Sequence, residues 1–230
     1  MNDSIMQKIV GIMLLFFSLT LVIPISVSLF YADGNHYTFI YSLMLIAILG
    51  ALLYLPNSSA KSDIRVKEGF LIVVLFWLVL SLVGSIPFML DKQLSLSFID
   101  AFFESVSGWT TTGATVITNL DSLSPSILIY RQELQWFGGM GIVILALAVL
   151  PMLGVGGMQL YKAESTGPIK DNKISPRIAE TAQSLWAIYL GLTITCAVLY
   201  YLAGMTPFDA IAHSFSTIAI GGFSTHNLSI

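Results

Sequence analysis

The stretch TTTGAT at residues 110–115 decides the fold, because a related stretch, AIGGFS, follows at residues 219–224. Aligned without a gap, the two copies place Gly113 on Gly222, and each copy ends a short apolar segment that resembles a helix. A long apolar span precedes each of these segments. A duplicated unit of membrane helix, short helix and glycine loop is typical of pore loops, which enter a membrane and turn back.

The composition indicates a membrane protein. Hydrophobic residues make up 56% of the sequence and charged residues only 10%, whereas about a quarter of the residues in a soluble domain are charged. A helix needs about 20 apolar residues to cross a bilayer. We therefore predict an all-α, multispanning protein. Five intervals are the predicted spans: residues 9–32, 35–60, 69–90, 134–161 and 181–208.

The basic residues predict how the chain is oriented. Most of them lie in alternate connections, which the positive-inside rule assigns to the cytoplasm. The amino terminus is then cytoplasmic, and both glycine loops open to the outside. Lys92 and Arg131 also fall on the outer side. The basic residues predicted to be cytoplasmic are Lys8, Lys61, Arg65, Lys67, Lys162, Lys170, Lys173 and Arg177.

Each glycine loop follows a helix that is too short to cross the membrane. Ser97 stands three residues before Asp100, and Thr206 stands three before Asp209, so both helices begin with a capping pattern. From there to the loop is roughly a dozen residues, or about 18 Å of helix, which is about half a bilayer. The carboxyl end of such a half-helix carries partial negative charge near the membrane centre, where it favours a cation.

The loops themselves suit a monovalent cation. An ion that sheds water needs backbone carbonyls that point inward, and glycine adopts the left-handed conformations that this requires. Neither loop contains a carboxylate, which argues against a divalent site. We predict that Gly113 and Gly222 are the filter glycines. The predicted ion ligands are the carbonyl oxygens of Thr111, Thr112, Ile220 and Gly221.

Several side chains near the loops have two interpretations. Glu104 and His213 occupy equivalent places in the half-helices, where they either set the outer electric field or are solvated or hydrogen-bonded for structural reasons. The glycines at 138, 139 and 141 either bend a pore-lining helix or let helices approach closely, and we favour close packing. We expect His36 and His226 to be merely exposed.

Enzymatic and nucleic-acid-binding functions are not supported by the sequence. Its 3 His residues are scattered, and no His/Cys cluster with metal-ligand spacing occurs. No phosphate-binding P-loop is present, so any dependence on ATP requires another subunit. The chain carries only 10 Lys and Arg residues, too few for a basic nucleic-acid surface.

The loops and three further segments resemble a known family. WTTTGAT at 109–115 and IGGFST at 220–225 resemble the first and second filter loops of the Trk/Ktr/HKT superfamily of potassium uptake proteins. WFGGMG at 136–141, MQLYKAE at 158–164 and PRIAETA at 176–182 resemble the membrane subunit of the bacterial Trk type. Two spans before the first repeat also favour this type over the shorter Ktr type.

The resemblance implies a function and partners. It implies potassium uptake across the bacterial inner membrane through a channel-like pore, with potassium as the transported ion and no organic cofactor. It also implies a homodimer that works with a cytoplasmic nucleotide-binding regulatory subunit of the TrkA type. The alternatives are a permease that also passes sodium, a re-entrant-loop carrier of another substrate, and a non-conducting fragment.

The resemblance further divides the chain. The family carries four helix, pore-helix, filter-loop and helix repeats, whereas this sequence holds one complete repeat and stops just after the second filter. We therefore expect an amino-terminal fragment or a truncated product. The predicted parts are a two-helix extension at 1–68, the first repeat at 69–153, a cytoplasmic loop at 154–177, and the first half of the second repeat at 178–230.

Overall fold

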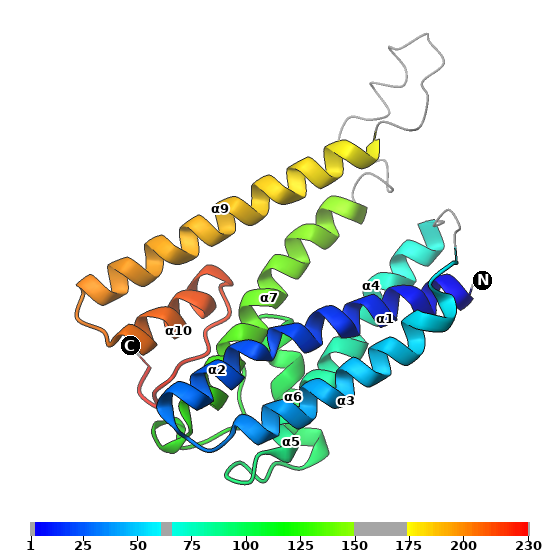
Figure 1. Ribbon diagram of the computed structural model, residues 1–230. Coiled ribbons are helices and arrows are strands. Elements are labelled where there is room, and N and C mark those ends of the chain that lie inside the picture. Colours follow the sequence, from blue (N-terminus) through cyan, green and yellow to red (C-terminus); the bar gives the residue numbers. More distant parts are fainter. Residues whose placement is uncertain (1–2, 61–65, 150–173, 230) are drawn as a thin grey trace.

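The computed structural model describes residues 3–60, 66–149 and 174–229, and helices are the only regular secondary structure within those ranges (Figure 1). This confirms the predicted all-α class. Four described segments are long and apolar enough to cross a membrane: Asp3–Tyr31, His36–Asn57, Leu71–Leu90 and Thr181–Leu202. They match four of the five predicted spans. The remaining span, 134–161, is described only as far as residue 149, where it is part of helix α7.

The first part of the chain is a hairpin of α1 (Asp3–Thr20), α2 (Val22–Tyr31) and α3 (His36–Tyr54), followed by the short 3-10 helix η1 (Leu55–Asn57). Pro24 cannot donate a hydrogen bond to the Thr20 carbonyl, which accounts for the break between α1 and α2. Helices α1 and α3 pack closely, because a Cβ atom at Gly11 would lie only 2.9 Å from the Gly50 carbonyl oxygen.

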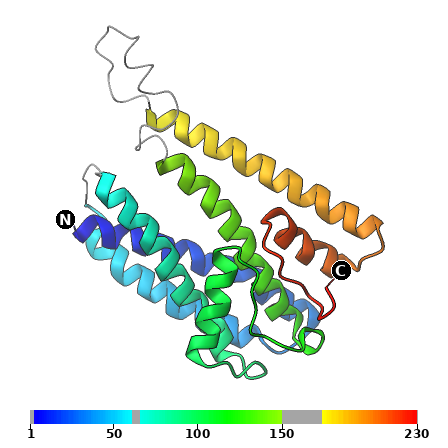
Figure 2. The same cartoon turned by 180° about the vertical axis from the view of Figure 1, so that it is seen from behind.

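The next part holds α4 (Val66–Gly84), α5 (Ile86–Leu90), the short helix α6 (Phe98–Trp109), the 3-10 helix η2 (Leu120–Ser122) and α7 (Pro125–Val149). The last part holds α9 (Ile174–Leu202) and the short helix α10 (Pro207–Ile218). Both short helices pack against α7, so α7 carries the two glycine loops on one support (Figure 2).

The predicted division into four parts stays a prediction. The predicted cytoplasmic loop at 154–177 lies almost entirely outside the described residues. The expectation that Arg131 lies in a connection between spans was wrong. Helix α7 begins at Pro125, ahead of the predicted span, and Arg131 lies inside it with a fully buried side chain. Its charge is compensated by a carboxylate, as described below.

Candidate functional site: two glycine loops on one helix

The two short helices begin in the same way. In α6 the Ser97 hydroxyl accepts a hydrogen bond from the Asp100 backbone N–H at 3.2 Å and donates to the Asp100 carboxylate at 2.7 Å. In α10 Thr206 and Asp209 make the equivalent pair of bonds at 3.1 and 2.6 Å. Each helix is 12 residues long. The predicted caps are therefore correct, and the two aspartates fix helix starts.

The two helices also end in the same way. The residue after each C-cap is left-handed, with φ of 55° at Thr111 and 56° at Ile220. The next residue closes the helix, because the Thr112 N–H donates to the Ser107 carbonyl at 2.9 Å and the Gly221 N–H donates to the Ser216 carbonyl at 2.8 Å. A β-branched residue rarely takes this conformation. The surrounding structure therefore holds both loops in a shape that their own residues disfavour.

A second left-handed residue follows in each loop, namely Gly113 with φ 77° and Gly222 with φ 84°. The loops touch each other, since a Cβ atom built at Gly113 would overlap the Gly221 carbonyl oxygen. Two segments that are distant in sequence thus meet at their glycines. Within the described ranges, no hydrogen bond ends on the predicted ligand oxygens, which are the carbonyls of Thr111, Thr112, Ile220 and Gly221.

Helix α7 reaches both loops through adjacent glycines. A Cβ atom at Gly138 would overlap the carbonyl oxygen of Trp109, the last residue of α6. A Cβ atom at Gly139 would lie 3.0 Å from the Cβ of Ala219, which caps α10. Gly138 and Gly139 therefore have the packing role that we favoured, at the helix ends from which the loops emerge, whereas Gly141 packs against the Phe76 ring.

A buried ion pair lies behind the loops. Arg131 Nε donates to Glu104 Oε1 at 2.9 Å, and both side chains are fully buried. The Glu104 carboxylate also accepts from the Thr115 hydroxyl at 2.9 and 3.0 Å and from the Val116 N–H at 3.1 Å. Of the two interpretations of Glu104, the hydrogen-bonded structural role fits these contacts. Solvation does not.

Two residues of α7 also contact the second loop. Arg131 Nη1 donates to the Ser224 carbonyl at 3.0 Å, and the guanidinium carbon lies 4.3 Å from the centre of the Phe223 ring. One helical turn later, Gln135 Oε1 accepts from the Phe223 N–H at 3.1 Å. The sequence interpretation missed both Arg131 and Gln135. The available signal was the opposite charges of Glu104 and Arg131, which lie in segments that carry few other charged residues.

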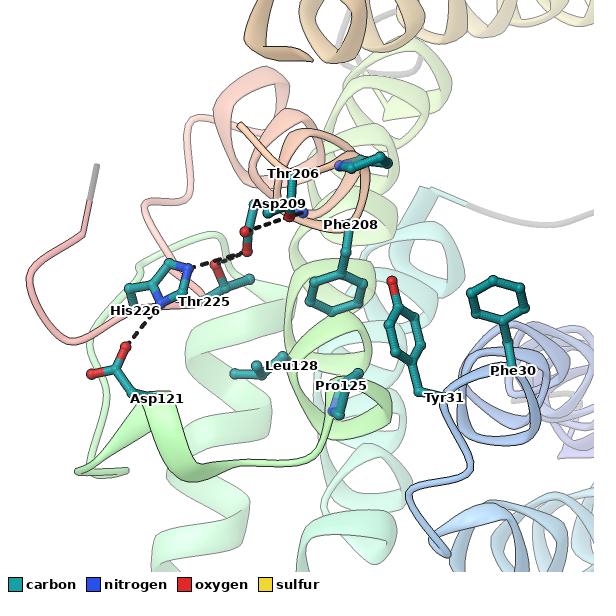
Figure 3. Close-up of a pocket in the computed structure, with 11 residues that line it drawn as sticks. Phe30, Tyr31, Asp121, Pro125, Leu128, Thr206, Phe208, Asp209, Thr225 and His226 are labelled. Atoms are coloured by element: carbon teal, nitrogen blue, oxygen red, sulfur yellow. Dashed lines mark hydrogen bonds and ion pairs between the residues drawn. The ribbon is translucent and has the colours of Figure 1, made fainter. Parts of the chain in front are cut away.

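A groove lies at the end of the molecule where α10 begins (Figure 3). Its volume is about 480 Å³, and Tyr31 of α2 meets Phe208 of α10 there with ring centres 5.5 Å apart. His226 was expected to be merely exposed, yet it lies between two carboxylates. Its Nδ1 is 2.8 Å from Asp121 Oδ1, and its Nε2 is 3.3 Å from Asp209 Oδ1.

In this groove His226 and the carboxylates of Asp121 and Asp209 stabilise one another's charged forms. The hydrogen bond that the His226 ring donates to the Asp121 carboxylate raises the pKa of His226 above its usual value, and Asp209 adds to the effect. The same hydrogen bond with His226 lowers the pKa of Asp121. Asn227 completes the contact, because its Nδ2 donates to Asp121 at 2.6 Å and its Oδ1 accepts from the Leu120 N–H at 2.8 Å. We call His226, Asp121 and Asp209 the loop clip, since they join the 3-10 helix η2 to α10 and to the segment after the second loop.

Comparison with known proteins identifies relatives of the whole chain. The family model TrkH, described as a cation transport protein, matches residues 35–230. The Trk system potassium uptake protein TrkH of Vibrio parahaemolyticus is 58% identical over 97% of this chain and 46% of its own length. TrkH of Escherichia coli K12 is 56% identical and TrkG of the same organism 43% identical, each over 100% of this chain and 48% of the relative.

A solved structure agrees with these sequence relatives. The crystal structure of the potassium transporter TrkH from Vibrio parahaemolyticus superimposes with a TM-score of 0.88 and 52% sequence identity, over 99% of this chain and 45% of that chain. The chain spans about half the length of the relatives that it matches. The resemblance inferred from the loop motifs is therefore confirmed: this chain belongs to the TrkH family of cation transport proteins.

Proposed function

We propose that this chain contributes two filter loops to a pathway for potassium uptake across the bacterial inner membrane. The observation that carries the proposal is the pair of loops that share left-handed residues, touch at Gly113 and Gly221, and leave four carbonyl oxygens without hydrogen-bond partners. Such oxygens can replace the hydration shell of an alkali cation. The relatives are Trk potassium uptake proteins by name, which favours potassium as the ion.

The electrostatics of the two short helices support a cation. Helices α6 and α10 both end at the loops, so the partial negative charge at each carboxyl end falls beside the proposed ion. In the proposed orientation the amino terminus is cytoplasmic and the loops open outward. Inward movement then follows the membrane potential, which contributes roughly 2.3 kcal/mol per charge per 100 mV. The role is transport rather than enzymatic chemistry.

We extend the proposal to partners on the basis of the family. The protein would act as a homodimer in the membrane, together with a cytoplasmic nucleotide-binding regulator of the TrkA type. Potassium is the transported substrate, and no organic cofactor takes part. The dimer and the regulator rest on the family resemblance of the sequence and not on contacts within this chain, and the potassium assignment rests on the names of the relatives.

One observation favours a second candidate, a pathway that also passes sodium. The first loop has the hydroxyls of Thr110 and Thr112 in contact at 2.8 Å, whereas the equivalent residues of the second loop, Ala219 and Gly221, carry no side-chain oxygen. Fewer fixed oxygens weaken the discrimination between the two ions.

Uptake measurements test both candidates. The complete gene is expressed in cells that lack their own potassium uptake, and the influx of rubidium, as a potassium substitute, is compared with the influx of sodium. Restored growth at low potassium with strong preference for rubidium supports the main proposal. Equal influx of the two ions supports the second candidate, and no influx of either ion contradicts both.

A further inference from the structure

The guanidinium of Arg131 touches three separate segments through three different nitrogens. Nε donates to Glu104 in α6 at 2.9 Å, Nη2 donates to the Thr115 hydroxyl at 3.1 Å, and Nη1 donates to the Ser224 carbonyl at 3.0 Å. Thr115 stands two residues after Gly113, and Ser224 stands two residues after Gly222. The Arg131 side chain therefore binds equivalent residues, Thr115 and Ser224, in the two loops.

Stability alone gives no reason to bury this pair. Arg131 and Glu104 are both 0% exposed, and removing two charges from water costs about as much as their attraction returns, so apolar residues often serve equally well in such places. Apolar residues, however, cannot form hydrogen bonds in defined directions. The planar guanidinium offers several donors at fixed angles, so it sets the relative position of all three segments.

We infer that Arg131 and Glu104 are a positioning pair that sets the spacing of the two filter loops and thereby the selectivity for potassium over sodium. The inference rests on the function proposed above. Neither side chain hydrogen-bonds to the four proposed ligand oxygens, so both act through the residues that follow the glycines. Phe223 links the Arg131 guanidinium to the second loop. It adjoins Gly222, its ring lies under the guanidinium, and its N–H donates to Gln135.

Selectivity depends on this spacing because both loops supply oxygens to one ion. Gly113 contacts the Gly221 carbonyl without room for even a methyl group between them. A filter can discriminate between ions of different size if its oxygens do not move inward around the smaller ion. It can also do so if the number of oxygens that coordinate the ion is fixed. Loosening the link between the loops allows them to adapt to sodium.

The test compares variants of graded severity in the complete protein. Arg131→Lys keeps the charge but has a single nitrogen in place of three, so it cannot hold all three segments. Thr115→Val removes the hydroxyl that accepts from Arg131, while Thr115→Ser retains it. Lys92→Gln is the control, because it removes a positive charge from an exposed side chain that takes no part in the pair. Each is measured as the ratio of rubidium to sodium influx per amount of folded protein in the membrane.

The expected result is a fall in the ratio for Arg131→Lys and Thr115→Val. The fall should be at least tenfold for Arg131→Lys, because the loss of a single hydrogen bond to a charged group already corresponds to about that factor. Thr115→Ser and Lys92→Gln should keep the ratio of the unaltered protein. A ratio that stays unchanged in Thr115→Val, or in Arg131→Lys when that variant reaches the membrane, overturns the inference while leaving the proposed function intact. An unaltered protein without rubidium influx overturns both.

Discussion

The first and second glycine loops have nearly the same backbone and different side chains. The left-handed φ values agree within a few degrees at Thr111 and Ile220 and again at Gly113 and Gly222. Yet the side chain of Ile220 is 89% exposed, while Thr110 and Thr112 hydrogen-bond to each other. The duplicated feature is therefore the path of the peptide chain. This is what a function carried by carbonyl oxygens requires.

The supports of the two loops differ as well. Glu104 in α6 binds Thr115 and Val116 beyond the first loop, whereas the equivalent residue of α10, His213, contacts the Thr225 hydroxyl at 3.0 Å beyond the second. A carboxylate and an imidazole thus fill the same place. The comparison teaches that one loop shape can be held by unrelated contacts, provided that each short helix reaches back to the segment after its glycine.

The largest difference between the loops should come from replacing their glycines. Gly113→Ala introduces a methyl group onto the Gly221 carbonyl oxygen in addition to left-handed strain, whereas Gly222→Ala meets no atom within 4 Å and adds strain only. Left-handed strain costs about 1–2 kcal/mol and overpacking about 1–3 kcal/mol more. We expect rubidium influx to fall on the order of 100-fold for Gly113→Ala and about tenfold for Gly222→Ala. Equal losses would show that the loops do not meet at Gly113.

A second test concerns how α7 holds the first loop. Gly138→Ala forces a methyl group against the backbone of Trp109, while Gly141→Ala meets only side-chain atoms, those of the Phe76 ring at 2.9 and 3.1 Å. We expect Gly138→Ala to destabilise the protein by about 1–3 kcal/mol and Gly141→Ala by clearly less. The apparent melting midpoint in detergent measures both. A larger loss for Gly141→Ala would contradict the proposed support by α7.

A third test uses the loop clip formed by His226, Asp121 and Asp209. The raised pKa of His226 means that its contribution is complete below the ordinary histidine pKa, about 6.5, and is lost as the pH rises through the raised value. The lowered pKa of Asp121 means that its contribution is present above the ordinary aspartate pKa, about 3.9, and is lost as the pH falls through the lowered value. Asp209 and His213 are the other titratable groups near His226.

The clip should therefore be strongest between about pH 4 and 6.5. Hydrogen exchange of residues 223–229 at several pH values, corrected for the intrinsic rate, reports its opening. We expect protection to decrease as the pH rises through the raised pKa of His226, and His226→Gln to remove this dependence. Protection that rises steadily toward alkaline pH would contradict the assigned contacts.

The smallest effect concerns left-handed strain in the second loop. Ile220→Gly relieves a β-branched residue from positive φ and should stabilise the protein by about 1 kcal/mol. Ile211 is likewise exposed but lies inside α10, where glycine is unfavourable by about 1 kcal/mol. The melting midpoint should therefore rise for Ile220→Gly and fall for Ile211→Gly. A fall in both variants would mean that Ile220 makes a contact that outweighs its strain.

Much of the fold could be predicted because its signals are local. Ser97 and Thr206 mark helix starts through caps formed by neighbours in sequence, and apolar length marks the spans. The pairing of Arg131 with Glu104 could not be derived, because it depends on α6 and α7 lying side by side. For the same reason Arg131 was expected in a connection between spans and His226 was interpreted as merely exposed. The glycine pattern predicted where each loop turns, but not that the loops touch.

Bound ions provide the most direct test of the central claim. The complete protein is crystallised with rubidium in place of potassium, and anomalous difference density is calculated around the two loops. The account predicts a peak beside the two loops, coordinated by the carbonyl oxygens of Thr111, Thr112, Ile220 and Gly221. Ordered density for both loops with no rubidium at these oxygens, or rubidium held only by side chains elsewhere, would contradict it.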